Sequence, residues 1–210
     1  MGRSFGGFRF VLLSCAALLI VAGCATPAPV TPPTAVVEQT RPALVAFTIN
    51  GRFSAKSAKE QASGQFRYSQ TATHRSLSIF SPLGTPMAEI TADGTGALLT
   101  MSNGATQRAD SVAELLRSVI ELPVTDAQLS MWLQARSSEM AVSANAMREH
   151  DALGRLSRFS ESGWDIFVSD RFAANDPNGN VADAPRRMRW VLSIDPETEV
   201  RWIIDEWKTP

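Results

Sequence analysis

Residues that could carry out enzyme chemistry are few and widely separated in this 210-residue chain. The two histidines, His74 and His150, stand in polar stretches and lack the spacing of metal ligands. The chain contains no nucleophile elbow, no zinc-binding His-Glu-x-x-His run and no phosphate-binding loop. The sequence therefore predicts a protein that is not an enzyme and that uses no metal or cofactor. A hydrolase would need a serine or aspartate with a base nearby, and we can nominate no such pair.

The residue with the most informative chemistry is Cys24, which ends the run Val21-Ala22-Gly23-Cys24. An apolar stretch at residues 10–22 precedes it, and Arg3 and Arg9 precede that stretch. Basic residues, an apolar segment and small residues in this order form a secretory signal peptide. An apolar segment of about 13 residues is too short to cross a bilayer, which takes about 20.

The run that ends at Cys24 resembles a bacterial lipobox. The resemblance implies that residues 1–23 are removed and that Cys24 then carries a diacylglyceryl group and an N-linked acyl chain, which together anchor a protein stably. The next residue is Ala25 rather than aspartate, which favours the outer membrane in the lipoprotein class that the run resembles. The alternative is a soluble exported protein in which this cysteine is incidental.

A proline-rich linker at residues 24–43 is predicted to connect the lipidated end to a folded domain at residues 44–210. It contains Pro27, Pro29, Pro32, Pro33 and Pro42. Proline favours extended geometry of roughly 3.1 Å per residue, so the linker reaches about 60 Å at most. The mature chain would retain no thiol for a disulfide, because Cys15 leaves with the leader and Cys24 takes the lipid.

The charge balance argues against nucleic acid as a partner. Loss of Arg3 and Arg9 leaves 18 basic and 21 acidic residues, a net charge of −3, where nucleic-acid binding needs a basic surface. The one local basic concentration is Arg186-Arg187-Arg189, either a solvated strand start or a contact for anionic lipid headgroups. Asp205-Glu206 is expected to be a solvated strand edge.

Short runs of alternating apolar and polar residues predict antiparallel strands through most of the folded domain. The apolar members are Phe47, Ile49 and Phe53; Phe66 and Tyr68; Leu77 and Ile79; Trp164, Ile166 and Val168; Met188, Trp190, Leu192 and Ile194; and Val200, Trp202 and Ile204. Tight turns are expected at Asn103-Gly104 and at residues 195–198.

Two short helices are predicted between these strands. Ser111 with Glu114, and Thr125 with Gln128, have the spacing of capping boxes, and apolar residues at helical spacing follow each of them. The sequence thus predicts a mainly β fold with helices (α+β), in which the helices close one side of a curved antiparallel sheet.

A set of short motifs, in a fixed order, resembles the LolB family over about residues 46–208. The set comprises Ser81-Pro82-Leu83-Gly84, Glu89-Ile90, Leu122-Pro123 before Trp132-Leu133, Gly163-Trp164 and the final Trp207, together with the lipobox.

The resemblance implies a half-open, 11-stranded antiparallel β-barrel with an α-helical lid over an apolar cavity. It also implies an outer-membrane lipoprotein receptor, expected to be a monomer, that accepts acylated lipoproteins from a LolA-type periplasmic carrier and inserts them among outer-membrane phospholipids. In the family, the loop corresponding to Pro82, Leu83 and Gly84 inserts cargo into the membrane through an exposed leucine, here Leu83. Residues that we expect to line the cavity are Phe47, Ile49, Phe66, Leu77, Ile79, Leu116, Trp132, Ile166 and Leu192.

A second interpretation stays open. The same strands could belong to a structural or protein-interaction lipoprotein of the outer membrane, whose core is filled by its own side chains. Alternation alone does not tell which face of each strand is concave.

Overall fold

The structure is a computed structural model that describes residues 41–120, 122–137 and 147–210. All of them belong to a compact unit that begins at Val36. The predicted leader, Cys24 and nearly all of the linker lie outside the described residues, as does most of the alanine-rich segment before Met147.

Eleven strands and two helices make up the described chain. They are β1 (Phe47–Lys56), β2 (Gln61–Gln70), β3 (Arg75–Phe80), β4 (Pro86–Asp93), β5 (Gly96–Met101), β6 (Thr106–Ala109), α1 (Val112–Ile120), α2 (Asp126–Leu133), β7 (Arg148–His150), β8 (Leu156–Glu161), β9 (Trp164–Arg171), β10 (Pro185–Leu192) and β11 (Asp195–Lys208). No helix among the described residues is long and apolar enough to cross a membrane.

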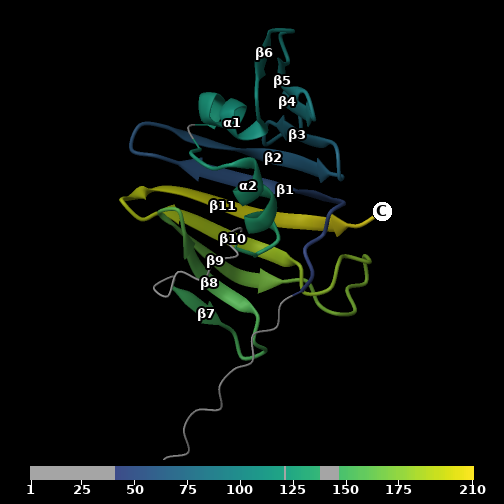
Figure 1. Cartoon of the computed structure of the whole chain (residues 1–210), viewed down its shortest axis with the longest axis vertical. Helices are drawn as coiled ribbons and strands as arrows, with labels where there is room; N and C mark the ends of the chain where they lie inside the picture. Colours follow the sequence, from purple (N-terminus) through teal and green to yellow (C-terminus); the bar gives the residue numbers. More distant parts are fainter. Residues whose placement is uncertain (1–40, 121, 138–146) are drawn as a thin grey trace, which may run out of the picture. The chain divides into compact units, whose positions relative to one another are not determined.

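All eleven strands form one antiparallel sheet in the order β6-β5-β4-β3-β2-β1-β11-β10-β9-β8-β7. The first and last long strands, β1 and β11, pair at its centre, and β6 and β7 occupy its two edges. The sheet therefore does not close on itself, and both helices lie over one of its faces (Figure 1). The predicted mainly β fold, with an open eleven-stranded sheet and a helical cover, is confirmed.

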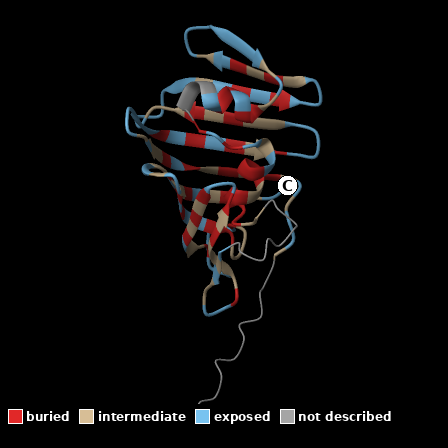
Figure 2. Cartoon of the chain, turned by 60° about the vertical axis from the view of Figure 1, so that its left-hand side comes forward, coloured by how far each residue is buried: buried red, intermediate tan, exposed pale blue. Residues whose placement is uncertain are grey.

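The alternating residues identify the face of the sheet that the helices cover. Along much of the long strands, buried positions alternate with more exposed ones, which gives the banding of Figure 2. The buried members are the predicted apolar ones, such as Phe47 and Ile49 on β1 and Leu77 and Ile79 on β3. We call this the inner face.

A β-bulge keeps the end of β11 in register with the inner face. Asn50 pairs with Glu206, but the next residue of β1, Gly51, pairs with Ile204, so Asp205 is the extra residue. A bulge shifts the two-residue alternation by one position. Trp207 therefore returns to the buried side three residues after Ile204, and both are fully buried. The same bulge turns Asp205 outward, where it forms an ion pair with Arg52.

The two predicted helix starts differ in detail. At α2 the capping box is complete: the Thr125 hydroxyl accepts from the Gln128 N–H at 3.2 Å, and the Gln128 side chain accepts from the Thr125 N–H at 2.8 Å. At α1 the Ser111 hydroxyl accepts from the Glu114 N–H, but the Glu114 carboxylate accepts from Asp110 instead. The first box is thus only half formed.

One predicted turn is displaced. The sequence pattern places Ile194 in a strand and a turn at residues 195–198, whereas the chain turns at residues 193–194 and β11 already begins at Asp195. The Ser193 N–H donates to the carbonyl of Gly163 in the neighbouring β8–β9 turn at 2.7 Å, which fixes this position. As a result the side chain of Ile194 is 88% exposed rather than buried.

Candidate functional site

Helix α2 covers a cluster of tryptophans on the inner face. Trp132 of α2 is fully buried. Its ring lies 5.4 Å from that of Trp190 on β10, edge to face, and 6.3 Å from that of Trp164 on β9. Trp190 in turn lies 5.1 Å from Trp202 on β11. Aromatic rings at these separations attract each other beyond the area they bury, so the cluster holds α2 against β9 and β10.

The structure brings together the nine residues expected to line a cavity. Eight of them are buried in one apolar cluster, and the ninth, Leu192, is partly buried and packs against it. Sequence reasoning left out several neighbours that belong to the same face, namely Tyr68, Trp164, Trp190, Trp202, Ile204 and Trp207. For five of the six, the alternation along the strand was enough to predict that they face the same side. Trp207 follows the bulge, so it is out of step with the alternation of Trp202 and Ile204.

Four indole N–H groups in this cluster have no hydrogen-bond acceptor among the residues that the structure describes. They belong to Trp132, Trp190, Trp202 and Trp207, and each nitrogen is buried. A buried donor without an acceptor costs about 1–3 kcal/mol. The inner face is thus apolar in bulk but carries unused hydrogen-bond donors.

Polar contacts tether α2 at both ends. Beyond its C-terminus, the Gln134 side chain accepts from the Leu44 N–H at 2.7 Å and donates to the carbonyls of Leu44 and Ser130 at 3.3 and 3.2 Å. Near its N-terminus, Gln128 donates to the Ser162 hydroxyl at 2.7 Å. The helix is therefore held by apolar packing beneath it and by a small number of hydrogen bonds around it.

Asp126 joins the two helices. Its carboxylate accepts from the Ala113 N–H in the first turn of α1 at 2.7 Å, and its other oxygen lies 3.5 Å from Arg75 of β3. A carboxylate near a helix N-terminus stabilises that helix. Since α1 packs against β4, β5 and β6, Asp126 links α2 to a helix that is docked elsewhere on the sheet.

A buried tyrosine lies on the same face. Tyr68 of β2 is fully buried, and its hydroxyl donates to Gln70 at 2.8 Å. Burial raises the pKa of Tyr68 to about 12, because the phenolate would lose its hydration. The hydroxyl therefore stays protonated and neutral at physiological pH.

The turn between β3 and β4 presents Leu83 to solvent. The Gly84 N–H donates to the Ser81 carbonyl at 2.9 Å, and the Ser81 N–H donates to the Thr85 carbonyl at 2.8 Å. Gly84 has a φ of +85°, which a side chain would disfavour. These contacts fix a tight turn between Pro82 and Gly84 from which the side chain of Leu83 projects, 95% exposed.

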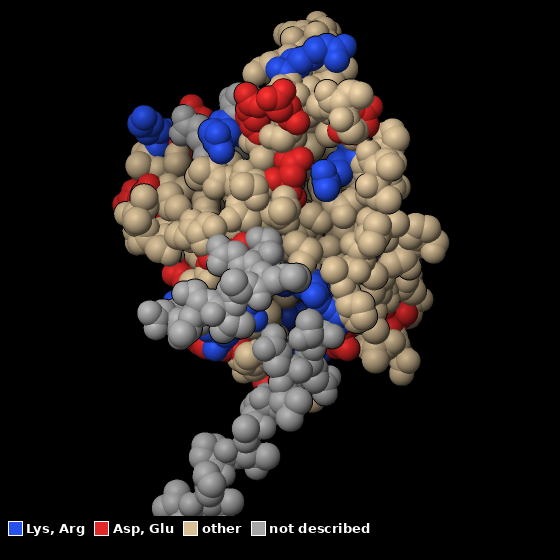
Figure 3. Space-filling model, in the orientation of Figure 1, with Lys and Arg blue, Asp and Glu red and all other residues tan. Residues whose placement is uncertain are grey.

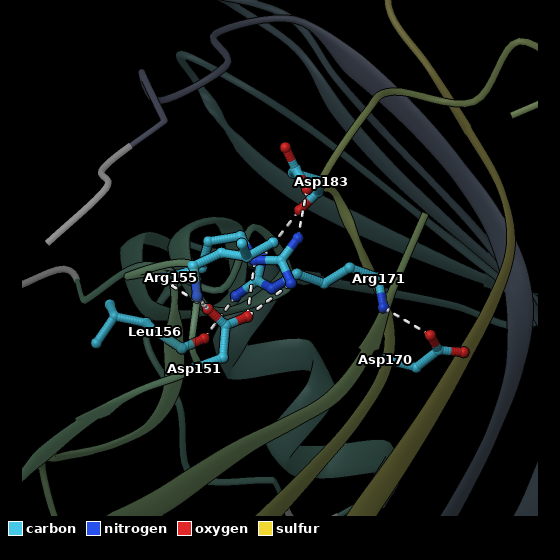
Figure 4. Close-up of polar contacts among 7 residues, drawn as sticks. Asp151, Arg155, Leu156, Asp170, Arg171 and Asp183 are labelled. Atoms are coloured by element: carbon cyan, nitrogen blue, oxygen red, sulfur yellow. Dashed lines mark hydrogen bonds and ion pairs between the residues drawn. The ribbon is translucent and has the colours of Figure 1, made fainter. Parts of the chain in front are cut away.

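An arginine–aspartate network lies at the end of the sheet opposite to the Leu83 turn (Figure 4). Arg155 forms ion pairs with Asp151 at 2.7 Å and with Asp183 at 2.5 Å. Arg171 donates to the carbonyls of Leu156 and Asp183 at 2.5 and 2.9 Å. Burial lowers the pKa of Arg171 to about 10, whereas the hydrogen bond from Arg155 to Asp151 raises the pKa of Arg155. The network ties the start of β8 to the end of β9 and to the loop that leads into β10.

A groove of about 680 Å³ lies at the ends of β2 to β6. Its lining includes His74, Arg75, Asp93, Arg108 and Asp110, and none of the nine predicted cavity residues. The charged side chains in this lining would lose hydration if an acyl chain covered them. In the part of the chain that the structure describes, no three His, Cys, Asp or Glu side chains lie close enough to hold a metal ion.

Charged side chains are interspersed on the surface. Figure 3 shows basic and acidic groups side by side on the face that it draws. The Arg186-Arg187-Arg189 cluster is itself paired: Arg186 and Arg187 each lie 3.7 Å from Asp170, and Arg189 lies 3.8 Å from Glu199.

Comparison with known proteins decides the family. A family model described as "Outer membrane lipoprotein LolB" matches residues 45–207. The chain belongs to the LolB family. The family resemblance predicted from the motifs is thereby confirmed, and the chain is an outer-membrane lipoprotein rather than an enzyme.

Individual relatives extend this match over almost the whole chain. The outer-membrane lipoprotein LolB of Azoarcus sp. is 28% identical over 93% of this chain and 93% of its own length. The protein of the same name from Thiobacillus denitrificans is 32% identical over 89% of this chain and 91% of its own length. Among solved structures, a LolA-superfamily protein from Nitrosomonas europaea is similar over 79% of this chain and 86% of its own, with a TM-score of 0.46 and 10% identity.

Proposed function

We propose that this protein is a receptor that accepts acylated lipoproteins from a LolA-type periplasmic carrier and inserts them into the outer membrane. In this proposal, the acyl chains of the cargo occupy the inner face beneath α2, and the receptor works as a monomer. The observation that carries the proposal is the continuous aromatic and aliphatic surface under a short helix with few tethers. Nine of the eleven strands, all but the edge strands β6 and β7, contribute buried side chains to this surface.

Energetics explain why such a receptor is needed. Three acyl chains contain about 45 methylene groups, and exposing each to water costs about 0.8 kcal/mol, about 36 kcal/mol in all. Free diffusion across an aqueous space is therefore excluded, and cargo must pass from one shielded pocket to the next. In the absence of a nucleotide-binding motif, a difference in affinity of a few kcal/mol between carrier and receptor makes transfer one-way.

The unpartnered tryptophan donors suit this cargo. Ester and amide carbonyls lie at the head of the acyl chains on a lipidated cysteine, and a carbonyl oxygen accepts a hydrogen bond from an indole N–H. Cargo would thus supply acceptors to strand donors that have none among the described residues, such as those of Trp190 and Trp202.

Binding requires α2 to move. Trp132 occupies the space directly above Trp164 and Trp190, so an acyl chain that contacts those rings must first displace it. We propose that α2 lifts from β9 and β10 to admit the cargo, with α1 remaining on β4–β6. The cavity thus forms by displacement of a lid rather than standing open.

We further propose that Leu83 places cargo in the membrane and that Cys24 carries the anchor. A bare leucine on a rigid turn buries apolar area as soon as it enters the interfacial region of a bilayer. The anchor at Cys24 and a linker of about 60 Å keep the receptor at high effective concentration beside the membrane.

A transfer assay tests the proposal. The receptor is incubated with a LolA-type carrier loaded with an acylated protein, and then with phospholipid vesicles; cargo should move first to the receptor and then to the vesicles. If no cargo leaves the carrier, the receptor function is refuted and the result favours the interpretation of the inner face as a filled core.

A single substitution separates acceptance from delivery. Leu83→Glu should accept cargo normally but deliver it at least about tenfold more slowly, because a charged group replaces apolar area at the interface. Leu153→Glu is the matched control, since Leu153 is also exposed, at 61%, but lies in the β7–β8 turn at the other end of the sheet. Delivery at the normal rate by the Leu83 variant would show that the turn has another role.

A further inference from the structure

The antiparallel register places several hairpin turns at one end of the sheet. Lys56 at the end of β1 pairs with Gln61 and with Glu199, so the β1–β2 and β10–β11 turns lie side by side, as Figure 1 shows at the left-hand edge of the sheet. Phe80 at the end of β3 pairs with Gln65 near the start of β2, which brings the β3–β4 turn to the same end. We call this the tip end.

Exposed aliphatic side chains concentrate at the tip end. Two of them, Leu83 and Ile194, are the most exposed large apolar residues in the described chain, at 95% and 88%. Met87 follows the Leu83 turn on β4, and the Met147 carbonyl accepts from Ser160 near the end of β8. Of the exposed large apolar residues, the tip end thus holds Leu83, Met87, Met147 and Ile194, and the opposite end holds Val45 and Leu153.

The turn that carries Ile194 is held as firmly as the one that carries Leu83. Besides the bond from Ser193 to Gly163 at 2.7 Å, the Asp195 carboxylate accepts from the Thr198 hydroxyl at 2.6 Å and from the Glu197 N–H at 3.3 Å. A rigid turn loses little conformational entropy when its tip enters the interfacial region of a membrane. The exposure of Ile194 is therefore a fixed feature of the fold.

We propose that Ile194 is a second membrane-contact residue, and that Leu83 and Ile194 together dock the tip end on a phospholipid bilayer. This inference rests on the proposed delivery of cargo to the outer membrane. The two turns are separated by about four strand spacings, roughly 19 Å along the sheet. Two contacts at that separation fix the tilt of the sheet against the membrane, which one contact leaves free.

The residues between the two contacts fit a lipid surface. The β1–β2 turn lies between them in the strand order and carries the exposed side chains of Lys56 and Lys59 along with Glu60. Ammonium groups attract lipid phosphates, whereas the neighbouring carboxylates Glu60 and Glu197 hold the tip end near neutral charge, which favours apolar contact over electrostatic adsorption.

The linker is long enough for this orientation. The described chain enters β1 at the end opposite to the tips, and β1 with its 10 residues spans roughly 34 Å. The predicted linker, at about 60 Å, exceeds that length. An anchor at Cys24 therefore allows the tip end to reach the same bilayer.

Site-specific labelling tests the inference on the whole acylated protein. The mature chain is predicted to have no free thiol, so Ile194→Cys, Leu83→Cys and Leu153→Cys each accept one environment-sensitive fluorophore. Each labelled protein is reconstituted into phosphatidylethanolamine–phosphatidylglycerol vesicles with and without nitroxide-bearing lipids. We expect lipid nitroxides to quench the labels at positions 83 and 194 at least about twofold more than the label at position 153, because collisional quenching needs contact with the interface.

The outcomes separate this inference from the proposed function. Quenching at position 83 but not at 194 overturns the second contact and leaves the receptor proposal intact, whereas equal quenching at all three positions overturns docking by the tip end. As a functional arm, Ile194→Ser should accept cargo normally and deliver it about three- to tenfold more slowly, in line with partial burial of one isoleucine. Unchanged delivery by this variant also counts against the inference.

Discussion

Replacement of Trp132 by alanine distinguishes a movable lid from a filled core. The side chain is fully buried and contacts Trp164 and Trp190. Truncation of such a residue lowers the free energy of unfolding by about 3–5 kcal/mol. Both interpretations of the inner face predict this loss, so stability alone does not separate them.

Affinity for acyl chains does separate them. If α2 must lift before cargo binds, the substitution raises the free energy of the closed, empty state but hardly affects the open state, in which Trp132 no longer packs on the sheet. The cost of opening then falls, and each 1.4 kcal/mol of that decrease strengthens binding tenfold. The truncation destabilises the closed state by about 3–5 kcal/mol, and relaxation of the neighbouring side chains recovers part of this. We therefore expect binding to tighten at least about tenfold.

The assay pairs urea unfolding with titration of a fluorescent fatty-acyl probe. Phe53→Ala is the control, because Phe53 is also buried but its ring lies against Trp202 of β11, at 6.1 Å, rather than against α2. The control should lose stability without gaining affinity. If Trp132→Ala loses the expected stability while probe affinity is unchanged or weaker, α2 is not a lid.

Two further predictions follow from buried polar groups. Tyr68 is the single tyrosine of the chain, so the absorbance of tyrosinate reports on it alone: it should ionise at a pH of about 12 in the native protein and near 10 in urea. Because the folded-state pKa is raised, the native state keeps a proton that the unfolded state loses, and Tyr68 contributes stability below pH 10 that is lost as the pH rises towards 12. Arg171, with a pKa lowered to about 10, has the opposite effect on stability over the same pH interval. Stability against pH would therefore mix the two groups, and tyrosinate absorbance is the appropriate readout. Equal ionisation midpoints of Tyr68 in the native and unfolded states would contradict the burial argument. Gln134→Ala should lower the free energy of unfolding by about 1–3 kcal/mol and speed hydrogen exchange at the Leu44 N–H, since it removes the three hydrogen bonds of a buried side-chain amide. Gln65→Ala is the control: it removes one exposed hydrogen bond and should change stability by less than about 0.5 kcal/mol.

Strand positions were predictable from sequence because burial on one face imposes a two-residue period. The alternation at Phe47, Ile49 and Phe53 placed β1, and the same reasoning placed most of the other strands. The capping pair Thr125 and Gln128 placed the start of α2 within one residue. These signals are local, so they survive without knowledge of the partners.

Features that depend on distant contacts were not predictable. The bulge at Asp205 arises from the pairing of β11 with β1, and it changes which of the last residues face inward. Ile194 matched the alternating pattern but lies in a turn, because Ser193 is held by a carbonyl of the β8–β9 turn about thirty residues earlier in the chain. Short β6 and β7 carry too few buried side chains for a period to emerge.

The site shows the same division. Eight of the nine residues predicted from apolar alternation are buried in the cluster. Which face of the sheet α2 covers emerged only from the packing of Trp132 on Trp164 and Trp190. The unpartnered indole donors likewise require three-dimensional contacts, since no sequence pattern shows whether a tryptophan N–H has an acceptor.

Under the proposed lid mechanism, the contacts of α2 set how strongly the receptor can hold its cargo. A helix of eight residues is too short to be stable alone, so when it lifts it must stay attached to α1 through Asp126, whose ion pair with Arg75 is long and partly exposed and therefore weak. The cost of opening then comes mainly from the buried side chains of Leu129, Trp132 and Leu133, at about 1.5–3 kcal/mol each, or roughly 5–9 kcal/mol.

The roughly 36 kcal/mol required to expose three acyl chains to water does not by itself offset that cost. Since the chains arrive from another shielded pocket and leave for a bilayer, only differences between the three environments count. The free energy that α2 gains when it returns to the sheet weakens cargo binding, and it favours release of cargo to the membrane by the same amount. Trp132→Ala should therefore accept cargo more readily and deliver it more slowly, and a variant that gained in both steps would show that lid closure does not drive delivery.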